Sequence, residues 1–128
     1  MRNRIEIPKG IYGITGDNFS NGRSNYFCVE EMIKGGIKIV QYRAKTKDTR
    51  EKVKEAREIR ELCRKNGVIF IVNDNVDIAL LVDADGVHIG QEDMHPDDVR
   101  KLIGDNKIIG LSTHSEKQGM EAYKNPNV

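Results

Sequence analysis

The stretch "IKIVQYRAK", residues 37–45, starts like a strand in the interior of a sheet and ends in polar side chains. Ile37, Ile39, Val40 and Tyr42 are β-branched or aromatic types that a buried strand accommodates. Gln41, Arg43 and Lys45 then follow at two-residue spacing, so a strand would direct all three to one face. An amide and two cations on one strand face indicate either a solvated edge strand or a face that meets a polar ligand.

Outward from this stretch, short β-type runs alternate with helix-like runs. Strands are predicted at 11–15, 37–43, 68–74, 86–90 and 107–112, and helices at 26–34, 48–66, 76–83, 95–104 and 115–125. The helix at 48–66 has the clearest pattern, because Asp48 and Glu51 have capping-box spacing and apolar residues recur on one face. Such alternation predicts an α/β fold with parallel strands. Periodicity leaves two architectures open, a small open doubly wound sheet and a (β/α)₈ barrel that stops early.

The composition suits a single globular domain over residues 1–128 and argues against several functions. Lys and Arg number 21 against 20 for Asp and Glu, and a formal net charge of +1 does not favour a nucleic-acid partner. No apolar run approaches the length of a membrane helix, and no apolar signal core follows the N-terminal arginines. Cys28 and Cys63 lie outside any C-x-x-C spacing, so we expect reduced thiols and a cytoplasmic location.

Polar side chains follow the predicted strands at the end where both architectures collect their chemistry. Asn73 and Asp74 end the third strand, Asp93 follows the fourth, and Ser112 ends the fifth. The two cations of residues 37–45 are good phosphate ligands. Two carboxylates together with phosphate oxygens are a common way to hold Mg²⁺. The combination predicts a site for a Mg²⁺-bound phosphate or pyrophosphate ester.

Each of these residues also has a purely structural interpretation. An Asn-Asp pair after a strand is a common turn or helix cap, so Asp74 or Asn75 could cap the helix at 76–83. Asp93 precedes a loop and a helix, so a cap is its default interpretation too. Ser112 can simply end its strand. His88 alternates with two apolar neighbours, which favours a packed, hydrogen-bonded histidine over a ligand. A zinc site built from His88, Asp93 and His95 matches no established ligand spacing.

In combination the motifs resemble those of one family. "QYRAK" is similar to the Q-x-R-x-K strand of thiamine-phosphate synthases, also called thiamine-phosphate pyrophosphorylases. "FIVNDNVDIAL", "ADGVHIGQEDM" and "IIGLSTHS" resemble the three strands that follow, in order and in spacing. The resemblance extends from about residue 10 to about residue 125. It implies a TIM-type (β/α)₈ barrel, of which this chain holds the first five βα units.

The resemblance also implies a transferase reaction between two small molecules. 4-Amino-2-methyl-5-hydroxymethylpyrimidine pyrophosphate would be coupled to a thiazole phosphate, giving thiamine phosphate and pyrophosphate. Residues at motif positions would bind the pyrimidine pyrophosphate, and they are Gln41, Arg43, Lys45, Asn73 and Ser112, with His88 near the same pocket. Asp74 and Asp93 would hold Mg²⁺. Arg43 and Lys45 would stabilise the leaving pyrophosphate, and no side chain would act as a nucleophile.

Three further features bear on this expectation, one in its favour and two against it. Thiazole tautomerases share the barrel but tend to lack both aspartates, so the presence of Asp74 and Asp93 favours a synthase. The motifs that bind the thiazole phosphate lie on the sixth to eighth strands of the family, and nothing here resembles them. Five strands leave two open sheet edges, which predicts self-association. The alternative function is therefore a non-catalytic module that binds a phosphorylated ligand or another chain.

Overall fold

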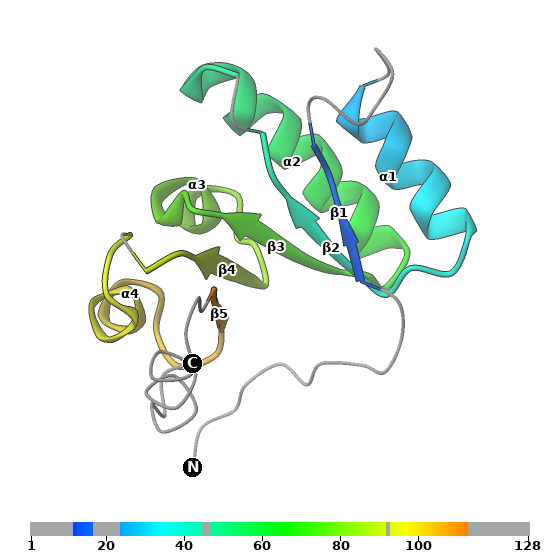
Figure 1. Cartoon of the computed structure of the whole chain (residues 1–128). Coiled ribbons are helices and arrows are strands. Elements are labelled where there is room, and N and C mark those ends of the chain that lie inside the picture. Colours follow the sequence, from blue (N-terminus) through cyan, green and yellow to red (C-terminus); the bar gives the residue numbers. More distant parts are fainter. Residues whose placement is uncertain (1–11, 17–23, 45–46, 92, 113–128) are drawn as a thin grey trace.

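The computed structural model describes residues 12–16, 24–44, 47–91 and 93–112, and its strands form one parallel sheet (Figure 1). The strands are β1 (Tyr12–Ile14), β2 (Ile39–Tyr42), β3 (Ile69–Asn73), β4 (Gly86–Ile89) and β5 (Ile108–Leu111). The helices are α1 (Asn25–Lys34), α2 (Thr49–Lys65), α3 (Val76–Leu81) and α4 (Pro96–Ile103). These elements confirm the predicted alternation to within a few residues at each boundary. The helix predicted at 115–125 lies outside the described residues.

The order of the strands distinguishes the two architectures that the sequence left open. The sheet runs β1-β2-β3-β4-β5, and every neighbouring pair is parallel. A doubly wound sheet reverses its direction of growth, so its spatial order departs from the chain order. Strands that follow one another around the sheet in chain order are those of a (β/α)₈ barrel. The described residues thus form a sector of a barrel, as the resemblance implies.

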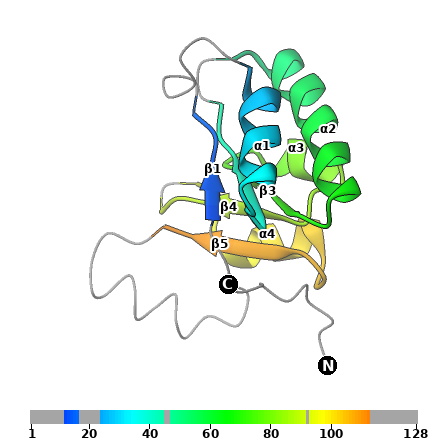
Figure 2. The same ribbon diagram turned by 90° about the vertical axis from the view of Figure 1, so that its right-hand side faces the viewer.

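The two faces of the sheet carry different side chains because successive residues of a strand alternate. Val40, Phe70 and Val87 point to the helical side and are fully buried there. Buried residues of all four helices pack in the same core, among them Ile59 of α2 and Val99 of α4. Figure 2 shows the helices on the outside of the sheet. The opposite face, which no helix of the described residues covers, holds the polar side chains.

Three polar contacts cap α2 and join the first two helices to the second strand. The Asp48 carboxylate accepts a hydrogen bond from the Glu51 N–H at 2.8 Å, which confirms the predicted cap of α2. The Glu55 carboxylate of α2 accepts hydrogen bonds from Asn25 of α1 at 2.9 Å and from the Tyr42 hydroxyl of β2 at 2.6 Å. One side chain therefore joins both helices to the second strand.

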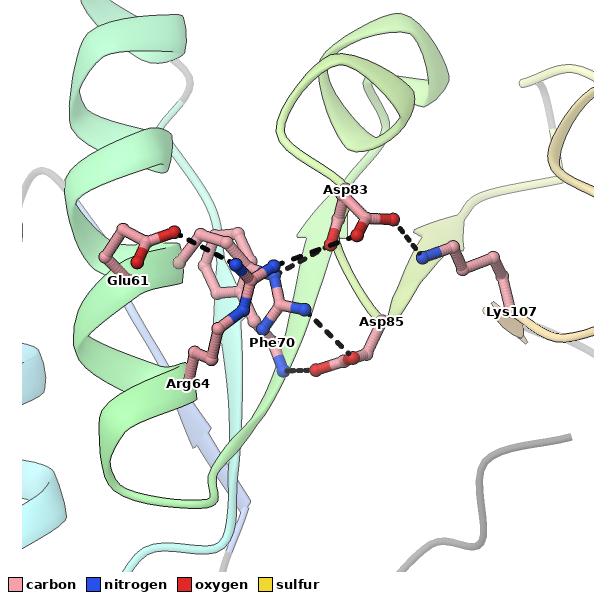
Figure 3. Close-up of polar contacts among 7 residues, drawn as sticks. Glu61, Arg64, Phe70, Asp83, Asp85 and Lys107 are labelled. Atoms are coloured by element: carbon pink, nitrogen blue, oxygen red, sulfur yellow. Dashed lines mark hydrogen bonds and ion pairs between the residues drawn. The ribbon is translucent and has the colours of Figure 1, made fainter.

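A network of charged residues lies at the amino ends of the strands (Figure 3). The Asp85 carboxylate accepts a hydrogen bond from the Phe70 N–H at 2.8 Å and forms an ion pair with Arg60 of α2 at 3.5 Å. The Lys107 ammonium donates to the Asp83 carboxylate at 2.6 Å, and this hydrogen bond lowers the pKa of Asp83. The network ties α2 to the starts of β3, β4 and β5, at the end away from the polar strand termini.

The cysteines behave as expected for a reduced protein. Both are free thiols. Cys63 is fully buried, and burial raises its pKa to about 12, which makes it a poor nucleophile.

Among the described residues, no helix has the length and apolar character that crossing a membrane requires.

Candidate ligand-binding site

A hollow of about 1180 Å³ lies on the face of the sheet that no described helix covers. The predicted site residues that the structure describes all line it, and they are Gln41, Arg43, Asn73, Asp74, His88, Asp93 and Ser112. Lys45 lies outside the described residues. Apolar side chains, including Ile39, Ile71 and Ile108, line the hollow nearer the amino ends of the strands. The expected convergence of polar groups from four strands is therefore present in the fold.

Gln41 and Arg43, at the end of β2, are held by hydrogen bonds with residues of β1 and the residue after it, which the sequence did not predict. Gln41 is only 5% exposed, and its Nε2 donates a hydrogen bond to the Tyr12 hydroxyl at 2.7 Å. The main chain of Arg43 is bound on both sides by the Thr15 hydroxyl, at 2.8 and 3.1 Å. Tyr and Thr are ordinary strand residues, so nothing in "IYGIT" marked them as parts of a site.

An irregular backbone explains how two consecutive residues, Asn73 and Asp74, both reach the hollow. Regular alternation would send Asp74 to the helical side of the sheet. Asp74 instead has φ = 66°, in the left-handed region, and its N–H donates to the His88 carbonyl at 2.7 Å. Asp is among the few non-glycine residues that visit this region readily. Asn75 occupies the cap position of α3, as one of the two predicted alternatives has it, but its side chain makes no cap hydrogen bond, and Asp74 is not the cap.

Asp93 closes a turn at the end of β4. Its Oδ2 accepts a hydrogen bond from the Gly90 N–H at 2.6 Å. His95 caps α4 instead, because its Nδ1 accepts a hydrogen bond from the Asp97 N–H at 3.2 Å. The default interpretation of Asp93 as the cap of the next helix is therefore wrong.

His88 is a hydrogen-bonded histidine at the wall of the hollow, as its alternation with apolar residues predicted. Its Nε2 lies 2.7 Å from the Ser112 hydroxyl. Burial lowers the pKa of His88, and the nearby Asp74 carboxylate opposes that shift only in part. The imidazole is therefore neutral near pH 7. Gly110 leaves space for the ring, since a Cβ at this position would lie 2.5 Å from the His88 Nδ1.

The carboxylates that line the hollow fit Mg²⁺ better than they fit Zn²⁺. Asp74 and Asp93 line the same hollow, and one Asp93 oxygen is already occupied by Gly90. Among the described residues, no group of three or more His, Cys, Asp or Glu side chains gathers as metal ligands. A protein cage for zinc needs such a group. Mg²⁺ needs only one or two carboxylates, with water and substrate phosphates completing its shell.

The charge of the hollow suits an anionic ligand. The half-buried Arg43 brings a cationic guanidinium whose planar shape matches phosphate oxygens in a bidentate manner. Amide and hydroxyl groups of Gln41, Asn73 and Ser112 line the same hollow and can donate or accept hydrogen bonds. The apolar residues beneath offer a surface on which a ring can lie. This arrangement suits a small molecule with an anionic group and a flat polar part.

Comparisons with known proteins agree with the geometry. The sequence profile of the family described as "Thiamine monophosphate synthase" matches residues 11–127. The thiamine-phosphate synthase of Pelotomaculum thermopropionicum is 58% identical over 118 residues, which cover 92% of this chain and 54% of that protein. The corresponding protein of Caldicellulosiruptor bescii is 53% identical over 112 residues, or 88% of this chain and 51% of the relative.

A solved structure is similar to this chain both in fold and in amino-acid sequence. The thiamine phosphate pyrophosphorylase from Pyrococcus furiosus superposes with a TM-score of 0.79 at 37% identity, covering 88% of this chain and 54% of that one. The chain spans about half the length of the curated relatives it matches.

Proposed function

This chain belongs to the thiamine monophosphate synthase family, and from that premise we propose that it forms the pyrimidine-pyrophosphate half of a thiamine-phosphate synthase site. The observation that carries the proposal is the shared hollow. The described side chains at the family's motif positions, from β2 to the end of β5, all line it, although they lie far apart in the sequence. A hollow with a cation, two carboxylates and several amides or hydroxyls is what a Mg²⁺-bound pyrophosphate ester requires.

In the proposed reaction the bond between the pyrimidine methylene carbon and the pyrophosphate oxygen breaks. The thiazole nitrogen then forms a bond to that carbon, and pyrophosphate leaves with the electron pair of the broken bond. Negative charge therefore grows on the leaving group, where Arg43 and Lys45 would stabilise it by charge and by hydrogen bonds. No side chain takes part as a nucleophile.

The remaining residues of the hollow would bind and orient the substrate. Gln41 and Asn73 carry amides that can form hydrogen bonds with the edge of an aminopyrimidine, and the Ser112 hydroxyl is held by the neutral imidazole of His88. Asp74 and Asp93 would hold Mg²⁺, which would neutralise part of the pyrophosphate charge when bound. The thiazole phosphate would be bound by parts of the family barrel that have no counterpart in the described residues.

Calorimetric titration with inorganic pyrophosphate tests this proposal directly. We expect binding by the wild-type chain in the presence of Mg²⁺, much weaker binding without Mg²⁺, and loss of the Mg²⁺ dependence in Asp74→Ala. Asp105→Ala is a matched control, because Asp105 is exposed in the connection between α4 and β5, at the opposite end of the strands. Binding that ignores both the metal and the Asp74 substitution would show that the hollow is not a Mg²⁺-pyrophosphate site.

Several further expectations belong to the same proposal. Strands β1 and β5 each have one neighbour in the described sheet, so their second edges are open to pairing and favour self-association. Light scattering of the purified chain would measure its mass in solution. A stable dimer whose melting temperature no pyrophosphate ligand raises would favour a non-catalytic binding module instead. A single domain over residues 1–128 and a cytoplasmic location stay predictions.

A further inference from the structure

Thr15 binds both main-chain polar groups of Arg43 through one hydroxyl. Its Oγ1 accepts a hydrogen bond from the Arg43 N–H at 2.8 Å and donates one to the Arg43 carbonyl at 3.1 Å. The Thr15 N–H in turn donates to the Gln41 carbonyl at 3.0 Å. Thr15 is 2% exposed, so water does not compete for these bonds.

These bonds replace strand pairing at the point where it stops. Strand β1 ends at Ile14 and β2 ends at Tyr42, so Arg43 is the first residue beyond the paired segment. Two hydrogen bonds with Thr15, the residue that follows β1, hold the Arg43 backbone at this point. A hydroxyl is required there, because among side chains of this size only Ser and Thr both donate and accept strongly.

We infer that Thr15 is a positioning residue for the anion site, fixing the Arg43 main chain so that its guanidinium enters the hollow in one direction. The inference rests on the proposed function, which gives Arg43 its ligand. An Arg side chain loses much rotamer freedom when it binds a ligand. A main chain that is already fixed leaves the side chain fewer orientations before binding, so less conformational entropy is lost. A small displacement of a positioning contact can weaken a charged interaction severely.

A simpler role for Thr15 would be to satisfy two buried backbone groups and nothing more. That role would make Thr15 important for stability but not for ligand binding. The two roles differ in one respect. If Thr15 acts through Arg43, its removal weakens pyrophosphate binding only while the Arg43 guanidinium is present.

The experiment measures the affinity for inorganic pyrophosphate with Mg²⁺ in a double-mutant cycle of Thr15→Val and Arg43→Ala. We expect Thr15→Val, which keeps the shape but removes the hydroxyl, to weaken binding by roughly five- to tenfold, the effect of one or two hydrogen bonds. Thr15→Ser keeps the hydroxyl and should bind within about twofold of wild type. In the Arg43→Ala background, Thr15→Val should cause no further loss.

The possible outcomes separate this inference from the proposed function. Equal losses from Thr15→Val with and without Arg43 would overturn the positioning role, as would undiminished binding by Thr15→Val. A wild-type chain that does not bind Mg²⁺-pyrophosphate would overturn the proposed function and this inference together. If Thr15→Val does not fold, Thr15→Cys takes its place in the cycle, because a thiol of similar size is a poor hydrogen-bonding partner.

Discussion

Replacing Gly110 by Ala tests whether the space beside His88 is part of the site. In β5, Gly110 pairs with His88 of β4, and a Cβ at this position would lie 2.5 Å from the His88 Nδ1 and 3.4 Å from its Cε1. The three atoms that it would approach most closely, apart from its chain neighbours, all belong to the imidazole ring. The ring must therefore rotate away, and its 2.7 Å contact with the Ser112 hydroxyl is lost.

The expected change in stability is the balance of three terms. A lost hydrogen bond costs about 1 kcal/mol, and an imidazole forced from its rotamer costs roughly 0.5–1.5 kcal/mol. Removing a glycine from a strand returns about 0.5–1 kcal/mol, because alanine has less freedom in the unfolded chain. Gly110→Ala should therefore lower the free energy of unfolding by about 1 kcal/mol.

The same substitution should change the free energy of unfolding in the opposite direction once the imidazole ring is absent. In the His88→Ala background the clash disappears and only the favourable term remains, so Gly110→Ala should raise the free energy of unfolding by about 0.5 kcal/mol. Urea denaturation of the four proteins of this cycle measures both effects. Gly35→Ala is a suitable control, because its Cβ would meet its nearest neighbour at an ordinary 3.4 Å.

The reasoning fails if Gly110→Ala costs the same with and without the imidazole. That result would mean that the main chain of β5 resists the methyl group, and that the contact between His88 and Ser112 survives in the variant. Pyrophosphate binding gives a second readout, because a displaced His88 would no longer hold the Ser112 hydroxyl in the proposed site.

Three further predictions concern other parts of the molecule. Gly86→Ala should destabilise the fold by about 3 kcal/mol or more, because its Cβ would overlap the main-chain oxygen of Ile108, which cannot rotate away; a urea midpoint near that of wild type would contradict this. Because Lys107 lowers the pKa of Asp83, their interaction should stabilise the protein at neutral pH and be lost as the pH falls below about 4. Asp83→Asn should thus cost at most about 1 kcal/mol at neutral pH, since the Asp83 carboxylate is largely exposed, and nothing in strong acid; an equal cost in strong acid would contradict the assignment. Finally, an aromatic disulfide reagent should leave Cys63 unmodified until the chain unfolds, because its pKa is raised to about 12 and it is fully buried; rapid reaction in the native state would show that the core opens there.

The parts of the fold that the sequence predicted are those set by local patterns. The two-residue alternation of "IKIVQYR" and the one-sided helix at 48–66 depend on neighbours within a few residues, and both were recovered in the structure. The choice between an open sheet and a barrel depends on which strand pairs with which. Both architectures use the same βα units, so periodicity could not decide, and the resemblance of combined motifs was needed.

The residues of the candidate site also divide into those that the sequence predicted and those that it did not. Residues at strand ends, such as Asn73 and Ser112, were predictable because parallel strands bring their carboxyl ends to one edge. Tyr12 and Thr15 were not, since their partners lie about 29 residues away and their types are ordinary in a strand. The structural alternative for Asp93, a cap of the next helix, was wrong because His95 caps α4 while the Asp93 carboxylate accepts a turn bond from Gly90.

Asp74 shows why such a site departs from local rules. A strand that kept its alternation would deliver one of two consecutive side chains to the hollow, yet both Asn73 and Asp74 line it. The left-handed conformation of Asp74 makes this possible at a cost of order 1 kcal/mol. The chain carries that cost at the carboxyl end of β3, while the ion pairs of Arg60 and Asp85 stabilise the amino end of the same strand. Stability and ligand binding are thus assigned to opposite ends of the sheet, and substitutions at one end should leave the other largely unchanged.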